Sequence, residues 1–260
     1  MRPRKSLGQN FLRDQTIIRR IVDALNLDTC DKVIEIGPGT GALTYKLVEE
    51  AGDVIAIEFD RDLLPGLKSQ FERFSSFRLI HDDALIVDLE EIINASGAPS
   101  RAKLVANLPY NISTPILQRL IEQRELFSTI VLMFQREVVE RITAQPGGKE
   151  RGFLSVLVEN AFESEHLFDV APGAFYPVPK VWSAVVRLTP KESQVTDEKQ
   201  FRRLISAAFA QKRKTIANNL RGVYQDAGEA LSNAGIDGQR RAETLTLNEW
   251  IVLNNVIFKK

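Results

Sequence analysis

A chain of 260 residues, 44% hydrophobic and 26% charged, has the composition of a globular protein with one large domain or two unequal ones. Its single cysteine, Cys30, excludes an intramolecular disulfide framework, and its two distant histidines, His81 and His166, argue against a metal site. No apolar run reaches the roughly 18 residues of a membrane span, and no secretory signal follows the basic N-terminus. We therefore expect a cytoplasmic protein that contacts neither metal nor membrane.

The formal net charge of zero hides an uneven distribution. Residues 1–20 carry six basic side chains and one acidic, and residues 191–260 carry twelve basic and eight acidic. Residues 21–190 consequently carry a net charge of −9. Basic ends around an acidic middle favour a protein that holds a polyanion with its termini, although solvated surface charge would give the same counts.

Short apolar runs alternate with amphipathic stretches along the first two thirds of the chain. This alternation predicts strands and helices in turn, and hence a parallel, doubly wound sheet whose last two strands form an antiparallel, hairpin-like edge. The predicted strands are residues 32–37, 53–60, 77–83, 103–107, 129–135, 166–172 and 183–190. The predicted helices are residues 41–51, 61–74, 113–123, 136–144 and 153–162, with Ser113 as an N-cap.

The pattern changes after residue 190. Residues 191–200 are polar and indicate a linker, and the segments 201–220, 228–236 and 245–259 show helical spacing without strands. We therefore expect a first domain of residues 1–190 and a small all-helical domain of residues 191–260.

A glycine-rich loop joins the first predicted strand to the first predicted helix. Gly37, Gly39 and Gly41 allow a sharp turn and a close approach of the backbone to a ligand, in front of the free N–H groups of a helix. Glu58 follows 21 residues after Gly37, where a carboxylate can accept hydrogen bonds from both hydroxyls of a ribose. Loop and acid together predict a cofactor that contains adenosine.

Two classes of cofactor fit this loop. The glycines and Ala42 also satisfy the dinucleotide fingerprint G-x-G-x-x-[GA]. Pro38 and Thr40 would be unusual beside a pyrophosphate, however, and Glu35 could face a cation, so these residues favour S-adenosylmethionine, which has a sulfonium and no phosphate. Asp83, at the end of the third strand, is a candidate acceptor for the adenine amino group, although an acid there could instead cap the next helix.

The fourth predicted strand ends on "NLPY" at the edge of the sheet where open α/β folds bind their ligands. An adenine amine is a poor nucleophile because its lone pair is delocalised into the ring. Two acceptors beside its hydrogens, the Asn107 side-chain oxygen and the Leu108 carbonyl held by Pro109, would free that lone pair. Tyr110 would offer a face on which a flipped base stacks. The alternative interpretation is a strand-to-helix turn with an Asn cap and a packed tyrosine.

Several segments together resemble the ribosomal small-subunit RNA adenine dimethyltransferases, the bacterial enzymes whose loss gives kasugamycin resistance. The resemblance covers nearly the whole chain, and the segments come in the order of that family. They are "KSLGQNFL" (5–12), "EIGPGTGALT" (35–44), "DDAL" (82–85), "NLPYNISTPIL" (107–117), "FYPVPKVWSAVVRL" (175–188) and "FAQKRKTIANNL" (209–220).

The resemblance implies an α/β fold, a Rossmann-like class I methyltransferase with a mixed seven-stranded sheet, followed by a helical domain that binds RNA and the ribosome. It implies S-adenosyl-L-methionine as the cofactor and dimethylation of two adjacent adenosines in a hairpin loop near the 3′ end of 16S ribosomal RNA. The implied substrate is a partly assembled 30S subunit, which would give the protein a part in late subunit biogenesis. We expect a monomer.

The resemblance also implies roles for single residues. Phe175 would be a second aromatic wall of the target pocket, opposite Tyr110, although it could instead be a core side chain. The implied cofactor contacts are Asn10 and Leu12 from a segment folded over the cofactor, Gly37 at the methionine part, Glu58 at the ribose, Asp83 at the adenine and Asn107 at the reacting centre. The glycine loop itself adds Gly39 and Gly41 as candidate cofactor contacts, and the strand before it adds Glu35.

A basic run at residues 211–221 is predicted to place several cationic side chains on one helix of the second domain. Such side chains contact backbone phosphates and so provide affinity and position, although an exposed helix face is the simpler interpretation of any one of them. The candidate RNA-binding residues are Arg4, Lys5, Lys212, Arg213, Lys214 and Arg221.

Two other functions remain open. One is a methyltransferase of large-subunit ribosomal RNA of the macrolide-resistance type, and the other is a non-catalytic RNA-binding or assembly factor on the same fold. The segments 107–117 and 209–220 favour the small-subunit enzyme over the first, and Glu58, Asp83 and Asn107 argue against the second. A dinucleotide-dependent dehydrogenase is a more distant possibility.

Overall fold

The computed structural model describes residues 4, 8–95, 101–109 and 112–258. Contacts divide the chain into two compact units. The first, the sheet unit, comprises residues 1–139 and 165–190, and the second, the helical unit, comprises residues 140–164 and 191–260. The helical unit contains the whole predicted second domain, residues 191–260. It also contains residues 140–164, which we had expected in the first domain.

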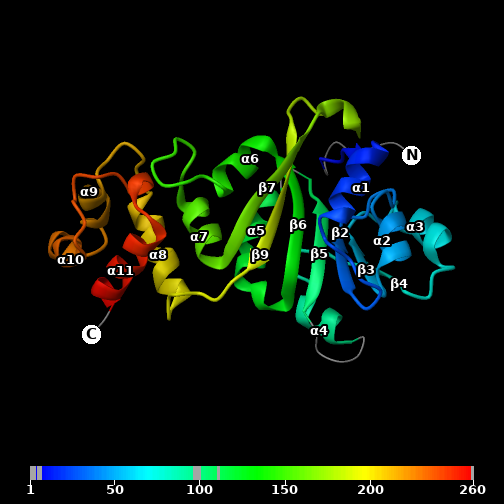
Figure 1. The fold of residues 1–260 in the computed structure, drawn as a ribbon, viewed down its shortest axis with the longest axis horizontal. Coiled ribbons are helices and arrows are strands. Elements are labelled where there is room, and N and C mark those ends of the chain that lie inside the picture. Colours follow the sequence, from blue (N-terminus) through cyan, green and yellow to red (C-terminus); the bar gives the residue numbers. More distant parts are fainter. Residues whose placement is uncertain (1–3, 5–7, 96–100, 110–111, 259–260) are drawn as a thin grey trace. The chain divides into compact units, whose positions relative to one another are not determined.

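One mixed sheet of seven strands lies at the centre of the sheet unit (Figure 1). Its order is β4-β3-β2-β5-β6-β9-β7, parallel from β4 to β6, with β9 antiparallel to β6. The mixed seven-stranded, Rossmann-like sheet is therefore confirmed. The strands are β2 (Lys32–Ile36), β3 (Asp53–Glu58), β4 (Phe77–His81), β5 (Ala102–Asn107), β6 (Phe127–Gln135), β7 (Phe162–Val170) and β9 (Ser183–Pro190).

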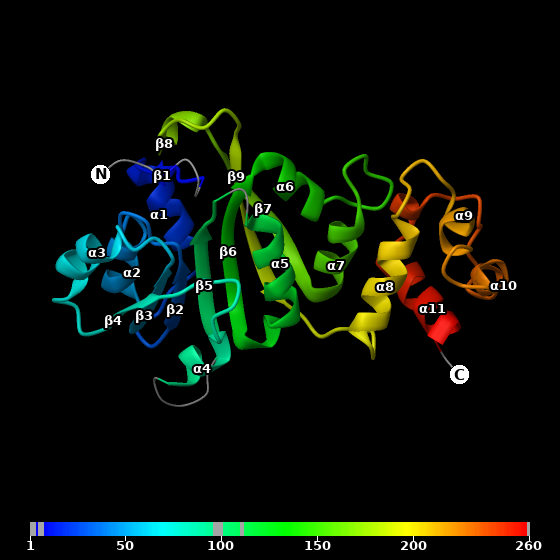
Figure 2. The same ribbon diagram turned by 180° about the vertical axis from the view of Figure 1, so that it is seen from behind.

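The central strands are apolar on both faces because helices cover both faces. Val33 of β2 and Val105 of β5 belong to one core cluster with the buried side chains of α1, α2 and α3, and α5 lies across the opposite face (Figure 2). Such two-sided burial explains why these strands are mainly apolar rather than alternating apolar and polar. The helices of this unit are α1 (Gln15–Asp23), α2 (Thr44–Glu50), α3 (Leu64–Phe71), α4 (Leu89–Asn94) and α5 (Ser113–Glu122); α6 (Arg136–Ile142) begins in it.

A second, two-stranded sheet was not predicted. β1 (Phe11–Leu12) pairs antiparallel with β8 (Phe175–Tyr176), so that Leu12 lies opposite Phe175. Two residues per strand are too few to give a periodic pattern in the sequence. The pairing joins the N-terminal segment to a part of the chain more than 160 residues away.

The prediction that Ser113 caps α5 is wrong. Ser113 is the first residue of the helix, and the N-cap is Ile112, which makes no side-chain cap. The Ser113 hydroxyl instead donates to the Pro109 carbonyl four residues earlier, at 3.3 Å. This back-bonding satisfies the hydroxyl inside the first turn and leaves the cap position to the preceding residue.

The helical unit is built around Trp250, which is fully buried. Here α7 packs against α8 and α11, and its own residues are almost all buried. A helix that is apolar on nearly every side needs neighbours on several sides, which explains why residues 140–164 belong to this unit. Its helices are α7 (Phe153–Ala161), α8 (Glu198–Ala208), α9 (Ile216–Leu220), α10 (Ala227–Asn233) and α11 (Leu247–Phe258).

The basic run does not form a helix, contrary to the prediction. Lys212, Arg213 and Lys214 lie in the exposed turn between α8 and α9. The side-chain amide of Asn219 donates to the carbonyls of Ala208 (2.7 Å) and Gln211 (3.1 Å), which ends α8. Asn219 therefore turns the chain at the point where the helical spacing alone would continue it.

Across the described ranges, no helix is both long enough and apolar enough to cross a membrane. In the same residues, no group of three or more His, Cys, Asp or Glu side chains is arranged to hold a metal ion.

Candidate active site

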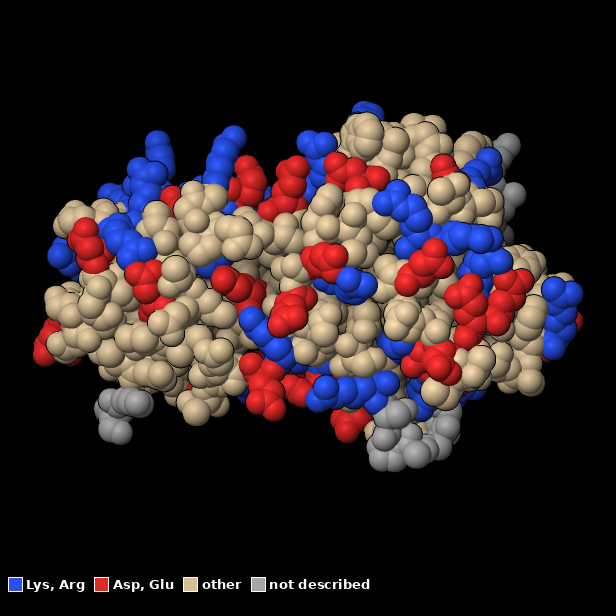
Figure 3. Space-filling model, in the orientation of Figure 1, with Lys and Arg blue, Asp and Glu red and all other residues tan. Residues whose placement is uncertain are grey.

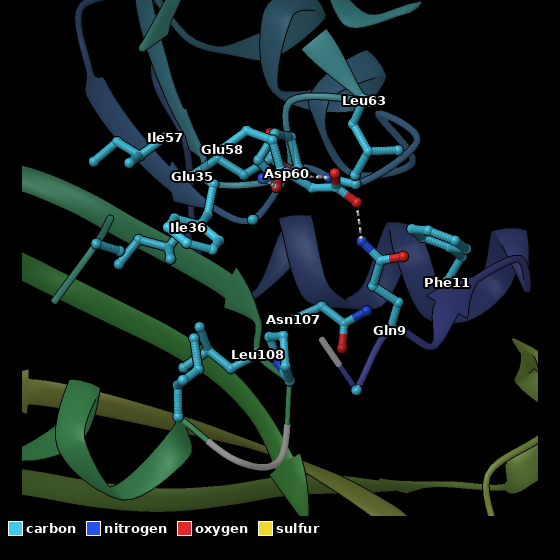
Figure 4. A pocket seen from close by; sticks show the side chains of 18 of the residues that line it. Gln9, Phe11, Glu35, Ile36, Ile57, Glu58, Asp60, Leu63, Asn107 and Leu108 are labelled. Carbon is cyan, nitrogen blue, oxygen red and sulfur yellow. Dashed lines mark hydrogen bonds between the residues drawn. The ribbon is translucent and has the colours of Figure 1, made fainter. Parts of the chain in front are cut away.

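A cavity of about 210 Å³ opens in the sheet unit at the carboxyl ends of β2, β3, β4 and β5 (Figure 4). Its walls come from the N-terminal segment 8–12, the glycine loop after β2, the residues that follow β3 and β4, the residues after β5, and Phe175 of β8. This is the sheet edge on which the sequence had placed the cofactor and the chemistry. The topology thus brings together residues separated by more than 160 positions.

The glycine loop turns sharply where it lines the cavity. Gly37 and Gly39 have φ values of 69° and 62°, a region that other L-residues rarely adopt. A Cβ atom on Gly39 would lie 3.1 Å from the ring of Phe11, so the glycine also lets the N-terminal segment approach the loop.

Gly41 is not among the residues that line the cavity. Its φ is 83°, and a Cβ atom there would lie 2.5 Å from the ring of Phe71 in α3. The packing of α3 against the loop therefore requires glycine at this position, and the contact of Gly41 with the cofactor stays a prediction.

Glu58 is buried at the end of β3 and holds the glycine loop in place. One carboxylate oxygen accepts from the Asp60 amide at 2.8 Å, and the other accepts from the Gly39 amide at 3.1 Å. Burial raises the pKa of Glu58, and these two hydrogen bonds partly offset the rise. Each oxygen has a second lone pair, so two acceptor positions remain for the hydroxyls of a ribose.

Glu35 lies beside Glu58 in the cavity wall and is almost completely buried (Figure 4). Burial, together with the smaller effect of the charge of Glu58, raises the pKa of Glu35 to about 7. The Thr44 hydroxyl, which donates to the carboxylate at 2.6 Å, has the opposite effect and lowers it. A cation in the cavity would stabilise the ionised form of Glu35.

Asp83 follows β4 and lines the cavity, and a side chain from outside the cavity holds the loop that carries it. One carboxylate oxygen of Asp83 accepts from the Leu85 amide at 2.8 Å, which leaves the second oxygen for a ligand. The guanidinium of Arg119 in α5 donates to the carbonyls of Ala84 (3.1 Å) and Val87. Arg119 has no recognisable signal in the sequence, because its partners are backbone atoms that any residue could supply.

Asn107, Leu108 and Pro109 line the opposite wall after β5. The Asn107 side-chain amide donates to the Asn10 carbonyl at 3.4 Å, so its oxygen remains available as an acceptor. Tyr110, the predicted stacking face, lies outside the described residues.

The N-terminal segment borders the cavity, and its polar side chains also bind carboxylates of the residues that follow β3. Asn10 and Leu12 line the cavity as the sequence had led us to expect. The Gln9 side chain donates to Asp60 at 2.7 Å (Figure 4), and the Arg4 guanidinium pairs with Asp60 at 3.1 Å and with Asp62. Sequence reasoning missed Gln9 and Asp60, whose contact joins positions 51 residues apart.

Arg4 is therefore occupied by two carboxylates, and the prediction that it contacts RNA is not supported by its position. Lys5 lies outside the described residues. Phe175 is buried among the core side chains and also lines the cavity, so both interpretations of it apply.

The remaining RNA candidates lie in the helical unit, where Figure 3 shows Lys and Arg side chains gathered near α9. Lys212 donates to the Lys149 carbonyl at 2.9 Å, which ties its turn to a neighbouring loop of the same unit. Arg213 and Lys214 are exposed. Arg221 follows α9, and its guanidinium donates to the side-chain oxygen of Asn218 at 3.4 Å.

The charge of the cavity wall separates the two classes of cofactor. Among the described residues, the side chains that line the cavity include five acidic ones and no basic one. The acidic residues are Glu35, Glu58, Asp60, Asp82 and Asp83. Such a wall would repel a pyrophosphate, whereas it suits a ligand with a sulfonium and an ammonium group. The residues present therefore fit S-adenosylmethionine and do not fit a dinucleotide.

Comparison with known proteins agrees with this geometry. The model of the family described as "Ribosomal RNA adenine dimethylase" matches residues 1–259. The chain is 45% identical to a "Ribosomal RNA small subunit methyltransferase A" of Magnetococcus marinus, with 97% of this chain and 91% of that protein covered. It is also 45% identical to the protein of the same name from Geobacter sulfurreducens, with 97% and 94% covered.

Two solved structures share the fold over nearly the full length. A dimethyladenosine transferase from Plasmodium falciparum matches with a TM-score of 0.80 and 29% identity, covering 94% of this chain and 95% of that one. The 23S rRNA methyltransferase ErmE matches with a TM-score of 0.75 and 26% identity, covering 95% and 99%. The chain therefore belongs to the ribosomal RNA adenine dimethylase family, whose enzymes transfer methyl groups from S-adenosylmethionine to adenines of ribosomal RNA.

Proposed function

We propose that the protein dimethylates the exocyclic amines of two adjacent adenosines in a hairpin loop near the 3′ end of small-subunit ribosomal RNA. Its substrate is a partly assembled 30S subunit, on which it acts as a monomer late in subunit biogenesis. One observation carries this proposal: the described side chains that line the cavity include acidic residues and no basic one, and Asn107 lines its opposite wall.

In this proposal the cofactor is held by groups from both ends of the cavity. The free lone pairs of Glu58 accept from the ribose, the free oxygen of Asp83 accepts from the adenine amino group, and Glu35 faces the cationic end. The backbone at Gly37 and Gly39 and the segment with Asn10 and Leu12 complete the wall. S-adenosylmethionine, when bound, supplies an electrophilic methyl group.

The chain activates the nucleophile by hydrogen bonds rather than by a general base. The Asn107 side-chain oxygen and the Leu108 carbonyl accept from the two amine hydrogens and thereby release the lone pair of the nitrogen. Tyr110 and Phe175 hold the base between them by stacking. The product ammonium loses its proton readily to water, so positioning and electrostatics account for the rate.

The helical unit contributes affinity through phosphate contacts. Lys212, Arg213, Lys214 and Arg221 provide cationic side chains on its surface. Such contacts position the RNA without reading its sequence.

A methyltransferase of large-subunit RNA is the second candidate, because the similarity to ErmE extends over 95% of this chain. The identity of 45% to proteins named for the small subunit favours the first. A non-catalytic assembly factor would not need the acceptor groups of Glu58, Asp83 and Asn107.

The deciding experiment is transfer of labelled methyl groups to ribosomal subunits that lack the modification. RNA from each subunit is then digested to nucleosides, and the labelled nucleoside is mapped. We expect dimethyladenosine in small-subunit RNA at two adjacent positions. Label only in large-subunit RNA would establish the second candidate, and no transfer to either subunit would establish a non-catalytic factor.

A further inference from the structure

The loop between β8 and β9, residues 177–182, exposes an unusual amount of apolar surface. The exposed fractions are 64% for Val178, 42% for Val181 and 49% for Trp182, and Tyr176 at the end of β8 is 47% exposed. Four large apolar side chains exposed within seven residues are more than the scattered single ones of an ordinary surface, and such a concentration marks a binding surface. We call Tyr176, Val178, Val181 and Trp182 the rim patch.

The rim patch begins at the wall of the active-site cavity. In β8 the side chains alternate, so that Phe175 points into the cavity wall, 4% exposed, and Tyr176 points outward. Tyr176 pairs with Phe11, whose own side chain also lines the cavity.

The far end of the loop returns to the same edge of the sheet. Trp182 accepts a backbone hydrogen bond from Arg136 at 2.9 Å, and Ser183 pairs with Gln135, the last residue of β6. Because β6 is parallel to β5, its last residue lies at the same edge as Asn107. The rim patch therefore lies at the sheet edge that carries the chemistry.

Cations accompany these apolar side chains. The Arg13 guanidinium lies 4.2 Å from the centre of the Tyr176 ring, and Lys180 is exposed within the loop. Neither Arg13 nor Lys180 forms an ion pair within the described part of the chain. Figure 3 shows mostly uncharged surface where the loop projects at the top of the view, with side chains of both charges around it.

We propose that the rim patch binds the RNA nucleotides that flank the target adenosine, with a neighbouring base stacked on Tyr176 or Trp182. This inference rests on the proposed function. An adenosine that enters the cavity leaves the bases beside it without a stacking partner, and exposed aromatic rings at the rim replace that partner. Arg13 and Lys180 then face the phosphates of the same nucleotides, a combination that suits single-stranded RNA better than an apolar protein surface.

The test combines protein variants with altered RNA. Tyr176→Leu and Trp182→Ala remove a stacking face at exposed positions, and Tyr45→Leu, at a tyrosine 40% exposed on α2, is the matched control. Binding is measured to unmodified small subunits reconstituted with RNA that carries either the normal base or an abasic residue beside the target adenosines. We expect Tyr176→Leu or Trp182→Ala to weaken binding to the normal RNA by about 5- to 150-fold.

The abasic RNA distinguishes stacking from other effects. If a flanking base stacks on the rim patch, wild type and the rim variant bind the abasic RNA equally, and Tyr45→Leu behaves as wild type on both. A variant effect of the same size on the abasic RNA, or no effect on either RNA, overturns the proposal. Because binding is read without methyl transfer, an inactive wild-type protein would refute the proposed function and leave this measurement valid.

Discussion

Replacement of Glu58 by glutamine tests the central feature of the cavity, a carboxylate that holds both the glycine loop and the ribose. The glutamine side chain has one acceptor oxygen and one amino group, whereas the amides of Gly39 and Asp60 both require acceptors. Its amino group must therefore face an N–H group at a position that is only 6% exposed, where water cannot relieve the conflict.

The expected loss follows from these hydrogen bonds. A hydrogen bond to a charged acceptor contributes about 1.5–3 kcal/mol, and the glutamine loses at least one of the two bonds to the ribose. The affinity for S-adenosylmethionine should fall by about 10- to 150-fold, because 1.4 kcal/mol corresponds to a factor of ten. Affinity for small subunits should be unchanged.

Isothermal titration with S-adenosylmethionine measures the first quantity, and subunit binding measures the second. Glu72→Gln, at an exposed glutamate after α3, is the matched control and should bind as wild type does. A dissociation constant for Glu58→Gln within a factor of about three of the control would refute the argument, since it would mean that no bond was lost.

Three further predictions concern the cavity and its supports, and a fourth concerns the basic turn of the helical unit. Asn107→Ala should lower kcat by roughly 100-fold or more while cofactor binding survives, as single-turnover rates and titration would show. Burial raises the pKa of Glu35 to about 7, so the folded protein keeps a proton that the unfolded chain releases near 4.5. The contribution of Glu35 to the free energy of unfolding therefore falls as pH rises from 4.5 to 7. Over that range Glu35→Gln should gain stability relative to wild type, as thermal unfolding scans would show. Arg119→Leu frees the carbonyls of Ala84 and Val87 and should raise KM for the cofactor by roughly tenfold with a smaller change in kcat; equal changes in both would contradict it. Charge reversal at Lys212 and Lys214 should weaken subunit binding and flatten its dependence on salt, and an unaltered salt slope would remove this turn from the interface.

The sheet and the cavity were predictable because each rests on a local pattern. The strands β2, β3 and β5 are covered on both sides and therefore appear as short, mainly apolar segments. The glycine loop and Glu58 have a fixed spacing because both lie at the ends of adjacent parallel strands. These patterns depend only on the chain nearby.

The features that sequence reasoning missed depend on contacts between distant residues. The pairing of β1 with β8 involves two residues on each side, and the contact of Gln9 with Asp60 involves single side chains. Arg4 was assigned to RNA because its charge was visible and its carboxylate partners were not. In the same way, the helix predicted over the basic run is ended by one side chain, Asn219.

Gly41 shows a different limit of sequence reasoning. A positive φ and a nearby ring both demand glycine, as a ligand would, so the residue type alone does not distinguish packing from binding. The contact with Phe71, which sequence spacing does not reveal, is sufficient by itself to require glycine.

The pairing of β1 with β8 has a consequence for synthesis of the protein. Residues 8–12 leave the ribosome before their partners Asp60, Asn107 and Phe175, which follow in that order, the last of them more than 160 residues later. A nascent chain can form β2, β3 and β5 while β1 still lacks its partner strand. The cofactor cavity is therefore completed only after β8 has been translated.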